Sequence, residues 1–149
     1  MPKRQYHTNI VAAYLVLRQG DQVLLLKRHN TGYEDGNFSL VAGHVEAGET
    51  FQAAIVREAK EEANLDIHPD HFSQTYVMHR KSNHDASERV DVFFVTEKWS
   101  GEVQNCEPGK CSELSWHPIE SLPENTVGYV REALEHILAG KNYAEHGWG

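Results

Sequence analysis

The chain has 149 residues, of which 24% are charged and 40% are hydrophobic, and this predicts a single domain over residues 1–149 with a buried core. The formal net charge of −8 argues against a nucleic-acid polymer as a partner, because no basic stripe is available to displace counterions from many phosphates. No apolar run approaches the roughly 20 residues of a membrane span, and residues 1–8 are basic and polar, so we expect a cytoplasmic protein without membrane attachment.

The first elements are expected to form a β-hairpin. Residues 9–17 are mostly apolar and branched, a polar stretch with Gly and Asp follows, and the apolar pattern resumes at 23–28. An apolar run, a turn and a second apolar run predict two antiparallel strands. The side chain of Arg28, at the end of the second strand, either keeps a sheet edge soluble or holds phosphate oxygens. A loop at 29–37 and a short strand at 38–42 are expected next.

The stretch 43–65 is expected to contain an acidic helix. At 100° per residue, Glu58, Glu61 and Glu62 share a face about 100° wide, and the opposite side carries Val56, Ala59 and Ala63. Two carboxylates about 4 Å apart repel by roughly 1 kcal/mol in water and about 4 kcal/mol at an effective dielectric of 20. Either solvent screens this repulsion along a plain hydrated face, or a divalent cation reverses it. Oxygen-only ligands suit Mg²⁺, with Mn²⁺ as the alternative.

The residues before the helix indicate a loop held in one shape. Gly43 and Gly48 bracket a tight turn, and Glu49 stands at the expected start of the helix. Arg57 directly precedes Glu58, where its guanidinium can pair with the Glu49 carboxylate. These features favour a metal site over a solvated helix face.

This stretch resembles the Nudix box, whose pattern is Gly-x5-Glu-x7-Arg-Glu-U-x-Glu-Glu-x-Gly-U, with U an aliphatic residue. The matching positions are Gly43, Glu49, Arg57, Glu58, Glu61, Glu62 and Leu65. Two positions depart from the pattern, since Ala59 is small for the first U and Asn64 replaces the second Gly. Asn is the next most tolerant residue in a left-handed conformation, so we expect Asn64 to cap the helix there and the catalytic geometry to survive.

The resemblance implies a Nudix-type α/β/α sandwich with a mixed central β-sheet, in agreement with the α/β class that strands on both sides of one amphipathic helix indicate. It also implies a hydrolase that binds Mg²⁺ or Mn²⁺ through Glu58, Glu61, Glu62, Glu107 and the carbonyl oxygen of Ala42. Within the catalytic set, Glu58 would take or orient the proton of the attacking water, a role that the family shares variably among carboxylates such as Glu61. Arg57 would fix the loop.

The second half of the chain is expected to alternate strands with loops and to end in a helix. The expected elements are a connection at 67–72, strands at 74–79 and 89–99, a mobile loop at 80–88, a loop at 105–116, a turn or short helix at 117–122, an amphipathic helix at 124–138 and a tail at 141–149. Cys106 and Cys111 are the only cysteines, and their spacing permits a disulfide or half of a zinc site. No Cys-x2-Cys or His-x3-His spacing supports zinc.

The loop 105–116 carries the second resemblance. MutT-type Nudix enzymes have a further glutamate in this loop, and Glu107 matches it within the sequence Glu-Pro-Gly-Lys-Cys. The same motif is similar to a subgroup that cleaves purine nucleoside triphosphates and forms homodimers. The residues expected to contact substrate are Arg28, His44, Lys110 and Asn125, the last as a base contact.

The implied reaction is hydrolysis of a nucleoside triphosphate, natural or damaged, to a monophosphate and pyrophosphate. Nudix hydrolysis of ADP-ribose, a dinucleoside polyphosphate or capped RNA is the alternative. Relatives that cleave the first two carry a Pro or a Tyr shortly after the box, and residues 77–90 contain neither. Further alternatives are a non-catalytic nucleotide-binding module on the same fold and an acidic helix without metal. Such modules usually lose box carboxylates, and all are present here.

Overall fold

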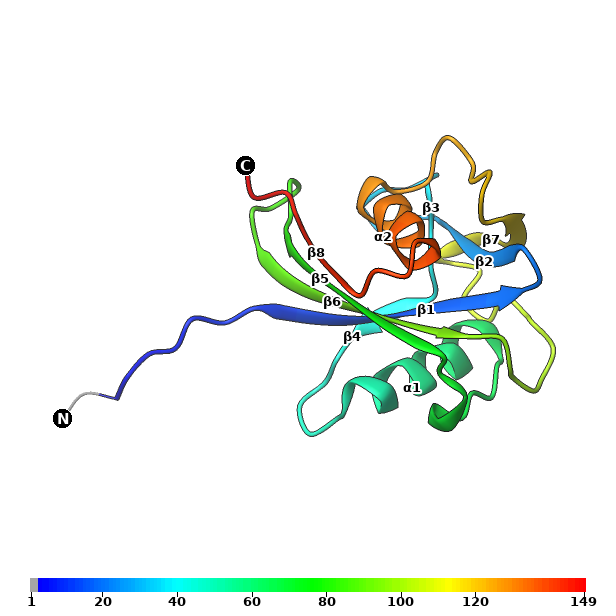
Figure 1. Cartoon of the computed structure of the whole chain (residues 1–149), viewed down its shortest axis with the longest axis horizontal. Helices are drawn as coiled ribbons and strands as arrows, with labels where there is room; N and C mark the ends of the chain where they lie inside the picture. Colours follow the sequence, from blue (N-terminus) through cyan, green and yellow to red (C-terminus); the bar gives the residue numbers. More distant parts are fainter. Residues whose placement is uncertain (1–2) are drawn as a thin grey trace.

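The structure is a computed structural model that describes residues 3–149. Two helices cover opposite faces of one mixed sheet (Figure 1). The helices are α1 (Phe51–Ala63) and α2 (Gly128–Leu138), and a short 3₁₀ turn spans Pro69–His71. The strands of the described chain are β1 (Ile10–Gln19), β2 (Gln22–Arg28), β3 (Phe38–Ser39), β4 (Ala42–His44), β5 (Gln74–Lys81), β6 (Glu88–Thr96), β7 (Cys111–Pro118) and β8 (Tyr143–His146).

The sheet is organised around β1, which lies at its centre. The strand order is β3-β2-β1-β6-β5-β8, with β4 paired to β1 and β7 paired to β2. The pairs β1/β6 and β5/β8 are parallel and the other pairs are antiparallel. The predicted α/β/α sandwich with a mixed sheet is therefore confirmed. No helix of the described residues is long and apolar enough to cross a membrane.

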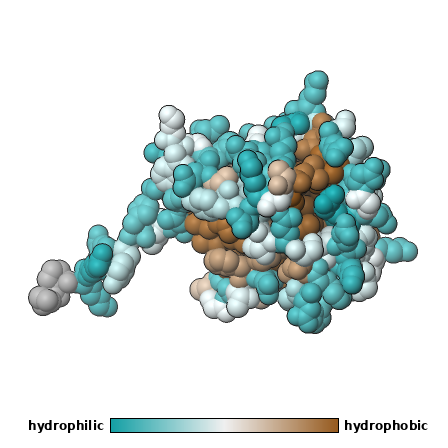
Figure 2. Space-filling model, in the orientation of Figure 1, coloured by the Kyte–Doolittle hydropathy of each residue, from teal (hydrophilic) through white to brown (hydrophobic). Residues whose placement is uncertain are grey.

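The core consists of two layers because the side chains of β1 alternate between the two faces of the sheet. Tyr14 and Val16 pack toward α2, whereas Leu15 and Leu17 pack toward α1. Burial on both faces explains why this central strand has a nearly continuous apolar sequence. Figure 2 shows a largely hydrophilic surface on this side of the molecule, with the hydrophobic residues gathered between the two helical layers.

Two strands were not expected from the sequence. Residues 111–118 form β7, which pairs with β2, although the sequence predicted a loop to 116 followed by a turn or helix. Ser112 and Glu113 are exposed, while Leu114 and Trp116 are only partly buried, so the alternation was weak. The C-terminal tail, for which no strand was predicted, forms β8 in parallel register with β5.

The last helix begins later than predicted, at Gly128 instead of residue 124. The segment before it is held by the backbone of Phe38, which donates to the Asn125 carbonyl oxygen and accepts from Val127 N. These cross-links hold residues 125–127 out of the helix. The predicted loop 80–88 is also shorter, since β5 extends to Lys81 and β6 starts at Glu88.

Candidate active site

The turn between β4 and α1 brings the helix against the sheet. Gly43 lies in β4, and a Cβ atom at this position would overlap the Glu58 side chain. Gly48 has a φ of 79°, which favours glycine, and Thr50 then caps α1 by accepting a hydrogen bond from Ala53 N at 3.0 Å. The two glycines thus have separate roles, one in close approach and one in the turn.

The docking face of α1 is rotated slightly from the predicted one. Ala59 and Ala63 are buried as expected. Val56, which was expected on the docking face, is only partly buried, and Ile55 is fully buried instead. Small alanines allow the helix to approach the sheet closely. As a consequence, Glu62 lies at the border of the buried face, and its carboxylate accepts a hydrogen bond from Ala42 N at 3.1 Å.

Arg57 links the box carboxylates. Its Nε and Nη2 atoms donate to the two oxygens of Glu49 at 2.7 and 3.0 Å, which is the bidentate pair expected from the sequence. Its Nη1 atom also donates to Glu58 at 2.8 Å and to Glu61 at 3.3 Å. Its Nη2 atom reaches the His44 carbonyl oxygen at 3.3 Å. One guanidinium therefore fixes the turn and partly neutralises the acidic helix.

The carboxylates around α1 influence one another. Burial, followed by the negative charge of Glu58, raises the pKa of Glu62 to about 8. Burial also raises the pKa of Glu58, although Arg57 opposes this shift. Repulsion from Glu107 and Glu61 contributes in both cases, so these side chains lie close to the same cluster.

The loop that carries Glu107 is attached to the end of α1. Cys106 N donates to the Glu62 carbonyl oxygen at 3.0 Å, and Gln104 N donates to the Ala63 carbonyl oxygen at 3.1 Å. Asn105 then orders the turn by accepting from Glu107 N at 3.1 Å. Glu107, which follows Glu62 by 45 positions in the chain, is thereby held beside the box glutamates. Cys106 is exposed and Cys111 is buried, and both are free thiols.

The chemistry of this donor set fits a hard divalent cation. Carboxylate oxygens are the ligands that Mg²⁺ and Mn²⁺ prefer, and a cation would compensate the charge of the Glu62 carboxylate. Within residues 3–149, no three acidic, His or Cys side chains are already gathered as a closed metal site. Arg57 instead holds Glu58 and Glu61. The Ala42 backbone reaches the cluster through its N–H group, whereas the sequence predicted a role for its carbonyl oxygen.

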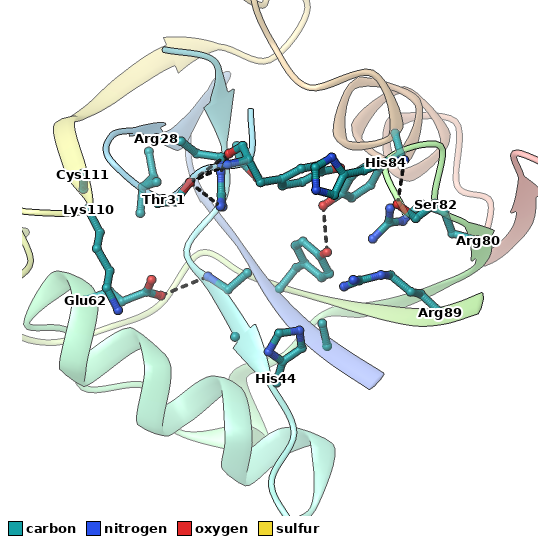
Figure 3. A pocket seen from close by; sticks show the side chains of 18 of the residues that line it. Arg28, Thr31, His44, Glu62, Arg80, Ser82, His84, Arg89, Lys110 and Cys111 are labelled. Carbon is teal, nitrogen blue, oxygen red and sulfur yellow. Dashed lines mark hydrogen bonds between the residues drawn. The ribbon is translucent and has the colours of Figure 1, made fainter. Parts of the chain in front are cut away.

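A cavity of about 570 Å³ extends from Glu62 along the face of the sheet (Figure 3). Five of the residues expected to bind metal or substrate line it, namely Arg28, Ala42, His44, Glu62 and Lys110. Arg28 also holds the β2–β3 loop by donating to the Tyr33 carbonyl oxygen at 2.6 Å. Asn125 does not line the cavity. Its side chain donates to the Gly36 carbonyl oxygen at 2.8 Å, so it braces the same loop from outside.

The far end of the cavity was missed by the sequence interpretation, which assigned its residues to two strands, a mobile loop and the last helix. It is lined by Tyr14, Arg80, Ser82, His84, Arg89 and Tyr129. Asp91 is fully buried beneath it and accepts from Arg80 and Tyr14. An aspartate near the start of the otherwise apolar run Val-Asp-Val-Phe-Phe-Val was the one signal that a buried polar network exists here.

Comparison with protein families finds that the NUDIX domain matches residues 7–137. NAD-capped RNA hydrolase NudC of Photorhabdus laumondii is 30% identical over 140 residues, which cover 90% of this chain and 50% of that protein. ADP-ribose pyrophosphatase of Methanocaldococcus jannaschii is 30% identical over 121 residues, which cover 81% of this chain and 69% of that protein. The chain spans about half the length of the NudC relative.

Solved structures share the same fold. A MutT NUDIX hydrolase from Burkholderia pseudomallei has a TM-score of 0.76 at 23% identity, over 88% of this chain and 99% of that one. A bifunctional NMN adenylyltransferase/ADP ribose pyrophosphatase from Francisella tularensis, complexed with AMP and a Mn ion, has a TM-score of 0.76 at 15% identity. That match covers 92% of this chain and 43% of that one. At these identities the likeness concerns the arrangement of strands and helices.

Proposed function

Because the chain belongs to the NUDIX family, we propose that it hydrolyses a phosphoanhydride bond in a nucleotide-linked substrate. The observation that carries the proposal is the gathering of Glu58, Glu61 and Glu62 on one helix, with Arg57 and Glu49 locking the turn beside them. The cavity reaches Glu62 directly, so a substrate bound there places its anhydride next to these carboxylates.

The residues divide the chemical task between binding and proton transfer. Glu61, Glu62 and Glu107 would hold Mg²⁺ or Mn²⁺. Glu58 and the carbonyl oxygen of Ala42 would complete the set of protein ligands. When bound, such an ion neutralises charge on phosphate oxygens and acidifies a coordinated water.

The protein's own side chains would supply the remaining interactions. Glu58 is mostly buried, and its raised pKa suits a group that accepts a proton from the attacking water. Lys110 and Arg28 line the same cavity and would neutralise the outer phosphate oxygens. Arg57 would position Glu58 without touching the substrate, because its donors are used within the turn.

The first substrate we propose is a nucleoside triphosphate, cleaved to a monophosphate and pyrophosphate. The ground for this choice is the resemblance of the motif around Glu107 to that of MutT-type enzymes. The relative from Methanocaldococcus jannaschii favours ADP-ribose as a second candidate, and the NudC relatives favour NAD-capped RNA as a third. A dinucleoside polyphosphate remains a further alternative. The retained carboxylates favour catalysis over a non-catalytic binding module. We propose a homodimer on the motif resemblance alone.

The proposal is tested by Glu61→Gln and Glu62→Gln, which remove a charge while preserving size. We expect each variant to lose at least about a hundredfold in Mg²⁺-dependent turnover, since metal-held charge contributes several kcal/mol to such transition states. Glu97→Gln is the matched control, because Glu97 is exposed and distant from the cluster in sequence. The assay should compare nucleoside triphosphates, ADP-ribose and dinucleoside polyphosphates, with products identified. Wild-type turnover in both folded variants would refute the metal assignment.

A further inference from the structure

The end of the cavity remote from Glu62 contains two arginines that face one another across β5 and β6. Arg80 and Arg89 are direct partners in the antiparallel register of these strands, so they project from the same face of the sheet. Both line the cavity, and Figure 3 shows their guanidinium groups directed into it. Like charges directly opposite one another on adjacent strands are destabilising. Such a pair is expected where an acidic group binds between its members.

The residues around Arg80 hold its side chain in one position. Its side chain is only 4% exposed, and its Nε atom donates to Asp91 at 2.6 Å. The Cζ atom lies 3.7 Å from the centre of the Tyr129 ring, so the guanidinium stacks on the aromatic face. Across residues 3–149, we find no hydrogen-bond partner for its Nη1 or Nη2 atoms. A buried guanidinium with unused donors aimed into a cavity is a preformed receptor for an acceptor group.

The acceptors at this end are already used. Asp91 is fully buried, and its two oxygens accept from Arg80 and from the Tyr14 hydroxyl at 3.1 Å. The Tyr14 hydroxyl in turn shares a hydrogen bond of 3.0 Å with Tyr129. Arg89 donates its Nε to Ser87 at 2.9 Å, while its Nη2 lies 3.5 Å from Asp85 at the surface. The charged side chains at this wall therefore present donors, which suits a ligand rich in acceptor oxygens.

We propose that Arg80 and Arg89 bind a phosphate group of the substrate, at the end of the cavity remote from the box glutamates. This inference rests on the proposed phosphoanhydride hydrolysis and defines its substrate class as a compound with phosphate charge at both ends of the cavity. The bound phosphate is either the terminal group of a polyphosphate chain or a separate phosphate on the nucleoside. Asp91 offsets the charge of Arg80, but Asp85 approaches Arg89 only at 3.5 Å near the surface, so an anionic phosphate suits this pair of donors better than the neutral edge of a base.

The binding step is tested with inorganic phosphate and metal-free protein, by isothermal titration calorimetry. Arg89→Gln removes one arginine, and the double variant Arg80→Met/Asp91→Asn removes the buried pair together, so no lone buried charge remains. We expect both to bind phosphate about tenfold or more weakly, the usual effect of losing a charged hydrogen bond. Arg131→Gln is the control, because Arg131 lies on α2 outside the cavity lining and donates to the Pro123 carbonyl oxygen. Circular dichroism confirms that each variant is folded.

Two results would overturn the proposal. One is phosphate affinity within twofold of wild type in both variants, or no binding by wild type at millimolar phosphate. The other concerns guanosine, used as a neutral base probe. The proposal fails if Arg89→Gln binds guanosine more weakly than wild type does but binds phosphate equally well. That outcome would assign the arginines to a base edge.

The source of the phosphate is tested by turnover of matched compounds in Mg²⁺. If the terminal phosphate is bound, Arg89→Gln reduces the preference for ATP over ADP, mainly through KM. If a phosphate on the nucleoside is bound, Arg89→Gln reduces the preference for coenzyme A over dephospho-coenzyme A. An unchanged preference in both pairs contradicts the substrate class. Absence of any Mg²⁺-dependent hydrolysis by wild type, with phosphate binding intact, would instead overturn the proposed reaction and leave the phosphate site in place.

Discussion

Gly43 and the Glu58 side chain lie so close together that no Cβ atom fits between β4 and α1 at this point. The glycine has an ordinary backbone conformation, since its φ is not among the positive values, so space is the reason for its presence. Whatever enlarges residue 43 must push Glu58 away from the strand. The first residue of the box and its central glutamate therefore act as one structural unit.

Replacing Gly43 by Ala should impair catalysis more than folding. The displaced Glu58 would no longer meet the attacking water, and a shift of about 1 Å in a reacting group can cost about a hundredfold in rate. We expect kcat to fall by about that factor while the circular dichroism spectrum is unchanged. Gly109→Ala is the control, because nothing lies within 4 Å of a Cβ at Gly109. Full activity of Gly43→Ala would mean that Glu58 can move without consequence.

The Arg57–Glu49 ion pair should make the thermal stability of the protein depend on pH. The hydrogen bonds from Arg57 lower the pKa of Glu49 from 4.5 to about 2 in the folded protein. Because the pKa of Glu49 is lower in the folded protein than in the unfolded chain, the ionised Glu49 carboxylate stabilises the fold above pH 4.5. This stabilisation disappears as the pH falls toward 2. We therefore expect Glu49→Gln to lower Tm at neutral pH and to match wild type near pH 2. Melting curves with EDTA across this range measure the difference.

A neighbouring carboxylate provides the control for that experiment. Glu46 lies in the same turn, is 69% exposed, and approaches Arg57 only to 3.8 Å. Glu46→Gln should follow the wild-type curve at every pH, because exposed pairs of this kind contribute little. A Glu49→Gln protein whose Tm deficit persists unchanged at pH 2 would show that its effect is not the loss of this ion pair.

The end of α1 offers a test of the box position where Asn replaces Gly. Asn64 adopts the predicted left-handed conformation, with φ 60° and ψ 32°, and its N–H caps the carbonyls of Ala59 and Lys60. Asn64→Ala should lower the free energy of unfolding by about 1 kcal/mol, the cost of a Cβ in this region without a compensating side chain. Asn64→Gly should lie within about 0.5 kcal/mol of wild type. Urea denaturation at neutral pH checks both values, and equal losses for Ala and Gly would indicate that the side-chain bond to Glu102 matters more.

Much of the box could be predicted because its geometry is local. The Arg57–Glu49 pair, the cap at Asn64 and the shared face of the glutamates all follow from helical spacing and turn chemistry within 23 residues. The position of Glu107 beside the cluster required a motif, since no local rule brings a loop 45 residues away onto the end of α1.

The far end of the cavity could not be predicted for a different reason. Arg80 and Arg89 meet only because of the register between β5 and β6, and a slip of one residue would place them on opposite faces. The strands β7 and β8 escaped notice because they pair with distant partners and carry many polar residues. Their stabilisation comes from sheet hydrogen bonds that sequence periodicity does not reveal.

The buried network of Tyr14, Arg80 and Asp91 should show strong coupling in stability. Arg80→Met alone leaves the fully buried Asp91 carboxylate without its cation, which typically costs 3–5 kcal/mol, so we expect a loss of about that size. Adding Asp91→Asn should recover most of it, because the remaining groups are neutral. Tyr14→Phe removes one hydrogen bond to Asp91 and should cost about 1 kcal/mol. Urea denaturation of the single and double variants forms a double-mutant cycle. Additive losses in the double variant would contradict the pairing, whereas a double variant more stable than Arg80→Met would establish it.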